Sequence, residues 1–133
     1  NGYRWPCPTI AAEIKGKFVP FPTATEIPGE GDFTLIVGKT MGHSGSYTTW
    51  AEGPMTVLGS QKLRLHPEDA AKLGVADGDE VNVSSSQGNI VVKATLHDCL
   101  PQGVVFLADH FTDPMANILT VNSNLCRVTI QKG

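Results

Sequence analysis

The chain has few of the features that most nucleic-acid-binding and membrane-spanning proteins need. It carries only 10 Lys and Arg residues against 13 Asp and Glu, which gives a net charge of −3, and the basic residues form no cluster. Nucleic-acid binding depends on such a cluster to neutralise phosphates, so we expect no nucleic-acid partner. No apolar run approaches the roughly 20 residues of a transmembrane helix, so we also expect no direct membrane insertion.

Cysteine is scarce and widely spaced. The chain has three, Cys7, Cys99 and Cys126. A disulfide framework would use an even number, and a zinc site would show Cys or His in close pairs. We therefore expect three reduced thiols. These residues do not fix the compartment; the cytoplasm is the expectation and the periplasm the alternative.

The sequence also lacks a catalytic arrangement. Its 4 His residues are isolated, with no His-x-x-x-His pair, and there is no Gly-x-Ser-x-Gly elbow. Gly38-Lys39-Thr40 resembles the end of a phosphate-binding P-loop. That motif requires a glycine five positions before Gly38, however, and Phe33 stands there. We therefore expect a binding role rather than a catalytic one.

The first thirty-one residues differ from the rest. They hold five prolines and show neither helical nor strand periodicity. Because each proline removes a backbone donor and favours extended geometry, we expect an interdomain linker over residues 1–31 and one domain over residues 32–133. The chain opens without an initiator Met or an apolar leader, so we expect a piece of a larger protein. The aromatic residues of the linker are expected to dock on a neighbouring domain: Tyr3, Trp5, Phe18 and Phe21.

The rest of the chain reads as mainly β. Short alternating or β-branched segments, separated by turn signals such as Asp77-Gly78 and Gln87-Gly88, predict six or so strands that close into a barrel. The segments are residues 33–37, 62–65, 80–84, 90–97, 104–108 and 127–131. His66 to Gly74 predicts a short helix, with Pro67 at its first position and Gly74 at its end. Residues 39–59 are expected to form a long loop.

Two loops carry candidate binding residues. Residues 42–49 combine glycines, hydroxyls and an imidazole directly after a strand, a composition that suits phosphate oxygens. A solvated surface loop is the alternative, although Tyr47 and Trp50 are unusual in one. Asp109 and His110 follow another strand, where turn chemistry is the alternative to ligand contact.

In order along the chain, these pieces resemble the C-terminal dinucleotide-binding domain of molybdopterin oxidoreductases of the formate dehydrogenase type. The segment from His66 to Val75 with Asp77-Gly78-Asp79 is similar to one family signature. Pro101-x-Gly103-Val-Val-Phe106, followed by His110 and Asn117-x-Leu119-Thr120, is similar to another. Trp5-Pro6-Cys7-Pro8 resembles the linker that leads into the domain.

The resemblance implies a six-stranded double-psi β-barrel with one or two short helices, preceded by a proline-rich linker. It implies a molybdopterin guanine dinucleotide whose molybdenum or tungsten is carried, and ligated, by the parent subunit. The other domains of that subunit, and iron–sulfur or electron-transfer subunits, are the implied partners. The implied cofactor-binding residues are Gly38, Lys39, Thr40, His43, Ser44, Ser46, Tyr47, Thr48, His110 and Asn117.

Two departures from the family pattern leave an alternative open. Lys39 stands where the family often has Arg, and the stretch between Thr120 and Arg127 is short. The shortening also fits a structural copy of the same domain, without cofactor, in the large iron–sulfur subunit of a respiratory NADH–quinone oxidoreductase. A free-standing double-psi barrel enzyme is a third reading.

Overall fold

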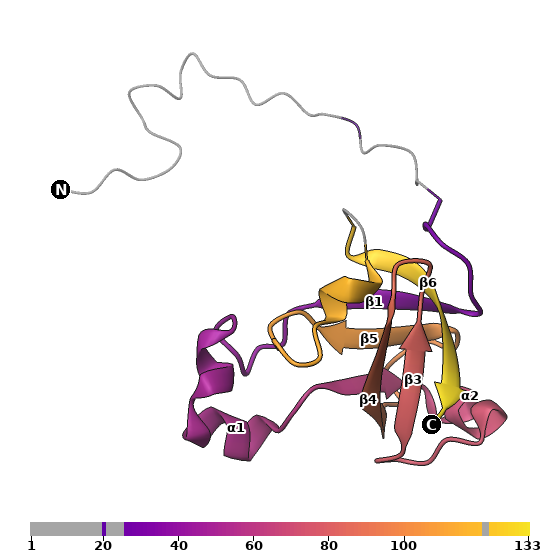
Figure 1. Cartoon of the computed structure of the whole chain (residues 1–133). Coiled ribbons are helices and arrows are strands. Elements are labelled where there is room, and N and C mark those ends of the chain that lie inside the picture. Colours follow the sequence, from indigo (N-terminus) through magenta and orange to yellow (C-terminus); the bar gives the residue numbers. More distant parts are fainter. Residues whose placement is uncertain (1–19, 21–25, 121–122) are drawn as a thin grey trace.

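A computed structural model describes residues 20, 26–120 and 123–133 of the chain (Figure 1). The expected linker over residues 1–31 lies largely outside the described residues. So do Cys7 and the four linker aromatic residues whose docking the sequence suggests.

Six strands form one closed barrel, in the spatial order β1-β5-β2-β4-β3-β6 (Figure 1). The strands are β1 (Phe33–Gly38), β2 (Lys62–Leu65), β3 (Glu80–Ser84), β4 (Asn89–Leu96), β5 (Val104–Ala108) and β6 (Leu125–Lys132). The pairs β1–β5 and β2–β4 are parallel, and the other four pairs are antiparallel. Each strand has two neighbours, which leaves no sheet edge open to solvent. The fold is the expected double-psi β-barrel.

The core follows from the alternation of side chains along the strands. In β2, Leu63 and Leu65 are fully buried, whereas Lys62 is exposed and Arg64 half-buried. The other strands alternate in the same way, and their inward side chains pack together at the barrel axis. The outward side chains of β2 are therefore free to line a surface feature.

The predicted helix after β2 is confirmed as α2 (Pro67–Leu73). His66 precedes it, and its Nδ1 accepts a hydrogen bond of 3.1 Å from the backbone N–H of Glu68. Gly74 ends the helix with a φ of +67°. The buried carboxylate of Asp69 accepts a hydrogen bond of 2.6 Å from the backbone N–H of Gly103, which fixes α2 to the turn before β5.

The prediction of a structureless loop over residues 39–59 is wrong in part. This segment contains a 3₁₀ helix, η1 (Tyr47–Trp50), and an α-helix, α1 (Glu52–Leu58), neither of which has a buried residue. Pro54 is compatible with α1 because it lies in the first turn, where the missing N–H has no helical partner. Figure 1 shows both helices projecting from one end of the barrel. In the described part of the chain, no helix has the length and apolarity to cross a membrane.

Candidate functional site

A cleft of about 740 Å³ lies where the loop after β1 meets β2, the end of β4 and β5. We call it the basic cleft. Its volume is in the range of small-molecule and cofactor sites. The residues that line it are Lys39, Thr40, Met41, Gly42, His43, Leu58, Ser60, Gln61, Lys62, Arg64, Thr95, His97, Cys99, Leu100, Phe106, Ala108 and Phe111.

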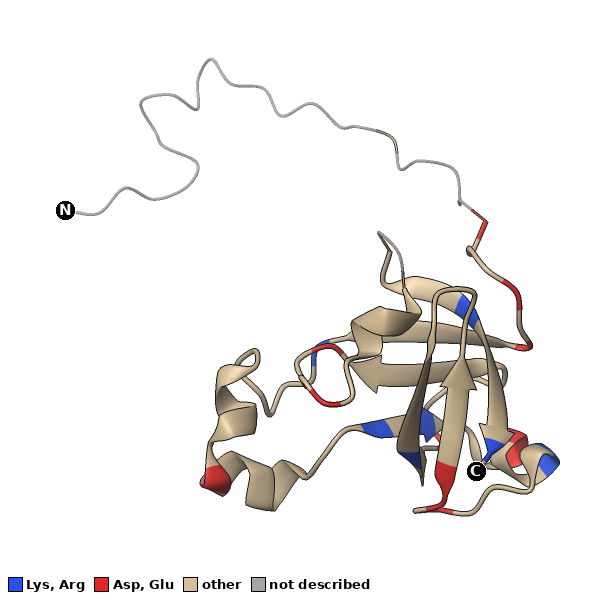
Figure 2. Ribbon diagram, in the orientation of Figure 1, with Lys and Arg blue, Asp and Glu red and all other residues tan. Residues whose placement is uncertain are grey.

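The charged residues that line the basic cleft are all of basic type. Lys39, Lys62 and Arg64 line it, and its described lining contains no Asp or Glu. The chain as a whole has a net charge of −3, so this local excess of positive charge opposes the overall balance. Figure 2 shows the blue ribbon of Lys and Arg on the strand that follows α1. Cations gathered in a cleft attract anionic ligands, above all phosphates.

Arg64 is held in place by an aromatic ring. Its guanidinium carbon lies 5.5 Å from the centroid of the Phe106 ring, and the two residues are partners in the β2–β5 pairing. A cation over an aromatic face is stabilised by the charge distribution of the ring. The ring therefore helps to orient a guanidinium group whose planar fork suits the oxygens of a phosphate.

Gln61 offers the cleft an unused acceptor. The residue is buried, with 4% of its surface exposed. Its Nε2 donates a hydrogen bond of 2.6 Å to the carbonyl oxygen of Ala108, which fixes the orientation of the amide. Its Oε1 is buried and has no hydrogen-bond partner among the described residues. A buried acceptor without a partner is costly, so Oε1 favours a ligand that presents an N–H or O–H group.

Two histidines from separate loops pack together at the cleft, His43 in its lining and His110 behind it. The rings of His43 and His110 lie 4.4 Å apart between centroids, and Phe111 packs against both. Thr40 Oγ1 is 3.4 Å from His110 Nε2, and Thr48 Oγ1 is 2.9 Å from His43 Nδ1. The Thr40–His110 contact and the packing of the rings fix the loop after β1 to the loop after β5, whereas the Thr48–His43 contact holds the first loop together. Together they fix one wall of the cleft.

His110 is held in its neutral form. Burial lowers its pKa from the ordinary value of 6.5, and the neighbouring His43 lowers the pKa further. The carboxylate of Asp109, 3.7 Å from His110 Nδ1, opposes both effects. A neutral imidazole has one donor and one acceptor nitrogen, so His110 can accept from or donate to Thr40 without adding charge.

The structure brings together only some of the residues that the sequence singled out. Lys39, Thr40 and His43 line the basic cleft, and His110 supports His43 from behind. Gly38 ends β1 beside Phe106, where a Cβ would lie 3.2 Å from the ring. Ser44, Ser46, Tyr47, Thr48 and Asn117 do not line the cleft. Of these, Asn117 is exposed on η2 (Ala116–Leu119).

Sequence reasoning missed Gln61, Lys62, Arg64, His97, Cys99 and Phe106 as lining residues. A signal for two of them was present. The alternation of residues 62–65 places Lys62 and Arg64 on one face of the strand, and two cations on one outward face mark a candidate anion site.

Comparison with known proteins finds a matching domain family and similarity to parts of several oxidoreductase subunits. The sequence profile described as "Molydopterin dinucleotide binding domain" matches residues 33–132. The chain is 29% identical over 127 residues to the NADPH-Fe(3+) oxidoreductase subunit alpha of Geobacter sulfurreducens, a match that covers 94% of this chain and 15% of that protein. It is 36% identical over 93 residues to the F420-dependent formate dehydrogenase 1 subunit alpha of Methanococcus maripaludis, covering 68% of this chain and 14% of that protein.

A third relative is an NADH-quinone oxidoreductase subunit of Rhizobium meliloti, 29% identical over 98 residues, covering 72% of this chain and 11% of that protein. The chain thus spans between 11% and 15% of the length of these three relatives. Among solved structures, the acetylene hydratase from Pelobacter acetylenicus has the same fold over 70% of this chain and 14% of that one, with a TM-score of 0.57 and 14% identity.

Proposed function

Since the chain belongs to the molybdopterin dinucleotide-binding domain family, we propose that its basic cleft holds the nucleotide and pyrophosphate parts of such a cofactor. One observation carries the proposal. The cleft is lined by Lys39, Lys62 and Arg64 and has no carboxylate in its described lining, as a site for a pyrophosphate requires.

The residues of the cleft fit the parts of that ligand. The three cations would hold phosphate oxygens, with Arg64 able to donate two parallel hydrogen bonds. The hydroxyl of Thr40 is a further donor. The unpaired Oε1 of Gln61 suits a ring that presents N–H groups, and guanine does so, in keeping with the guanine dinucleotide form of the cofactor.

The redox chemistry of the cofactor and the binding role of this chain are separate. A bound molybdopterin supplies the redox chemistry of its enzyme, and we place the protein ligand of its molybdenum or tungsten elsewhere in the parent subunit. This chain binds and orients the dinucleotide. Neutral His110 supports the wall of the cleft without adding charge.

We further propose that residues 32–133 are one domain of a longer subunit, joined through the linker over residues 1–31. The chain spans 15% of the length of the Geobacter sulfurreducens relative. Large apolar side chains on η1 and α1 are open to solvent: Tyr47 is 87% exposed, Trp50 79% and Val57 82%. Such a surface is stable when covered, so it favours packing against other domains of that subunit. Electron-transfer subunits would complete the enzyme.

A structural copy without cofactor, in a respiratory NADH–quinone oxidoreductase, is the second candidate. The similarity to the Rhizobium meliloti protein favours it. Pterin and metal analysis of the purified parent subunit separates the two, since only the first predicts both components.

The test of the proposed site uses the parent subunit. Lys39→Ala and His43→Ala are compared with the control variant Lys93→Ala. Lys93 is an exposed lysine of β4 that pairs with Lys62 of β2 but lies outside the described lining of the cleft. We expect the pterin retained after purification to fall in the first two variants and to stay unchanged in the third. Unchanged pterin content in all three would overturn the assignment.

A further inference from the structure

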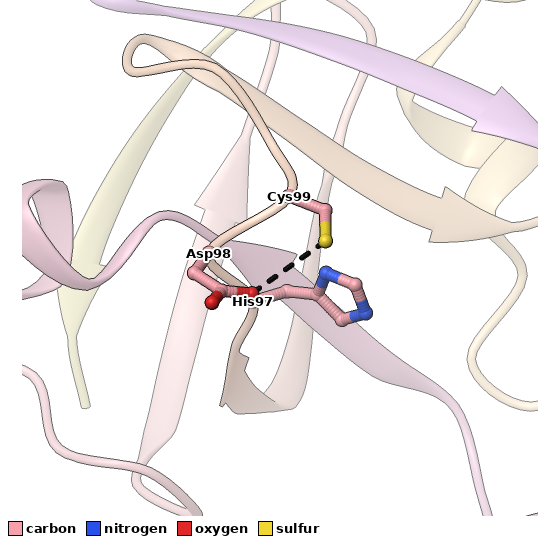
Figure 3. Close-up of side chains that lie close together, drawn as sticks. All are labelled: His97, Asp98 and Cys99. Carbon is pink, nitrogen blue, oxygen red and sulfur yellow. Dashed lines mark hydrogen bonds between the residues drawn. The ribbon is translucent and has the colours of Figure 1, made fainter.

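The turn that follows β4 places three different metal-binding side chains together. One donor atom each from His97, Asp98 and Cys99 lies within 4.8 Å of the others, and all three residues are exposed (Figure 3). The backbone of the turn is fixed at both ends. The N–H of His97 donates to the carbonyl oxygen of Leu65 at 2.9 Å, and that of Leu100 donates to the carbonyl oxygen of His97 at 3.3 Å.

We propose that His97, Asp98 and Cys99 form a binding site for Zn²⁺, or for a divalent ion of similar preference, at the edge of the basic cleft, where His97 and Cys99 belong to the lining and Asp98 lies beside it. The inference goes beyond the proposed cofactor site and does not depend on it. The wide cysteine spacing predicts no zinc site, but a site of mixed ligands needs only one cysteine. The sequence feature that indicates such a site is the run of three consecutive residues, each with a different metal-binding side chain.

The donor set selects the kind of ion. An imidazole nitrogen, a carboxylate oxygen and a thiolate sulfur are all ligands that Zn²⁺ takes, whereas Mg²⁺ and Ca²⁺ require mostly oxygen. Tetrahedral zinc holds its ligand atoms about 3.5 Å apart, given metal–ligand distances of about 2.0–2.3 Å. The three donors here lie within 4.8 Å, so small movements of exposed side chains bring them to that separation.

The charge balance decides whether a cation is tolerated in a basic cleft. Lys39, Lys62 and Arg64 line the same cleft and repel a cation. The carboxylate of Asp98 and the thiolate of Cys99 offset this repulsion, because their two negative charges neutralise the two positive charges of a divalent ion. The Cys99 Sγ–H, now directed at Asp98 Oδ1 at 3.6 Å, loses its proton to solvent when the metal–sulfur bond forms. No oxidation or reduction takes place.

Three protein ligands leave one position of a tetrahedral ion open. His97 and Cys99 both line the basic cleft. An ion bound by them therefore stands at the cleft wall, where water or an oxygen of an anionic ligand would take the open position.

The test is a titration of the reduced 133-residue chain with Co²⁺, a spectroscopic substitute for Zn²⁺. We expect a sulfur-to-cobalt charge-transfer band that disappears when Zn²⁺ is added. Cys99→Ser abolishes the band, and His97→Ala shifts the titration to higher Co²⁺ concentration. Circular dichroism verifies that each variant is folded, which the exposure of the turn leads us to expect.

Cys7→Ser is the matched control because it removes a thiol outside the turn, and it keeps the band. Absence of a band from the unaltered chain would overturn the proposal. So would a band that survives Cys99→Ser or is lost in Cys7→Ser. A failure here leaves the retention of pterin by the parent subunit untouched, so the two proposals are tested separately.

Discussion

The rings of His43 and His110 pack at a tilt of 39° with their centroids 4.4 Å apart, although one residue follows β1 and the other follows β5. The contact joins the two loops that flank the basic cleft. It also places His110 beside a second imidazole in a partly buried environment, where charging His110 is disfavoured. The two loops therefore meet at a buried histidine whose neutral form is favoured.

Stability should depend on pH through His110. Its pKa in the folded chain is lowered, chiefly by burial, whereas the unfolded chain has the ordinary value of 6.5. The unfolded chain therefore binds the proton more readily, and the contribution of neutral His110 is present above pH 6.5 and is lost as the pH falls below that value. Urea denaturation at several pH values between about 5 and 7.5 measures this loss.

His110→Gln should flatten that pH dependence. His97→Gln, measured with a chelator present, removes an exposed histidine and should leave the profile of the unaltered chain in place. Equal slopes for the unaltered chain and His110→Gln would contradict the assignment.

Removal of the buried carboxylate of Asp69 should destabilise the barrel. Asp69→Ala leaves the N–H of Gly103 without its acceptor and also ends the contact of 3.2 Å with Lys72. We expect a loss of about 1–3 kcal/mol in the free energy of unfolding, and a smaller loss for Asp69→Asn, which keeps an acceptor oxygen. Urea denaturation provides the measurement. Glu68→Ala, one position earlier on the exposed face of α2, should change the free energy by no more than about 0.5 kcal/mol.

Two glycines allow the cost of backbone strain to be measured apart from the cost of a steric collision. Gly31 and Gly103 both have positive φ values, +144° and +75°. A Cβ at Gly31 would collide with the backbone of Val128, whereas a Cβ at Gly103 meets nothing within 4 Å. We expect Gly31→Ala to lower the free energy of unfolding by about 2 kcal/mol or more, and Gly103→Ala by about 1 kcal/mol, both measured by urea denaturation. Comparable losses for the two variants would show that the approach of β6 to Gly31 is not a close one.

The ring of Phe106 should matter for ligand retention because it orients Arg64. Phe106→Leu removes a cation–ring interaction of about 0.5–1 kcal/mol, so we expect about a threefold loss of affinity for the dinucleotide. Arg64→Ala should lower the affinity for the dinucleotide further than Phe106→Leu does. Arg64→Lys should not restore binding, because lysine lacks the planar fork. Pterin content of the purified parent subunit is the readout. Arg127→Ala, which removes an arginine of β6 outside the described lining of the cleft, should retain the normal amount.

The strands and α2 could be predicted because their signals are local. Alternation along residues 62–65 and 90–97 is set by neighbouring residues, and Pro67 with Gly74 marks both ends of one helix. α1 was missed because it has no buried face and therefore no hydrophobic period. Its formation depends on the helix start at Glu52 and Pro54, which the glycine-rich surroundings obscure.

The site was predictable only along one stretch of chain. Lys39, Thr40 and His43 follow one another in the loop after β1, so sequence analysis could group them. Arg64 and Gln61 join them through the pairing of β2 with β5, which no local pattern encodes. The burial of His110 likewise results from contacts between distant loops, and a residue beside a turn signal gives no indication of it.

The order of the strands around the barrel also bears on when the cleft comes into existence. β1 pairs only with β5 and β6, which follow the other strands of the barrel in the sequence. A nascent chain that has emerged as far as β4 therefore holds β1 without a partner, and its loop has no opposite wall. The barrel closes only after β6 has been made. Any ligand of the cleft must then be inserted after β6 has been made, into a closed barrel rather than an emerging one.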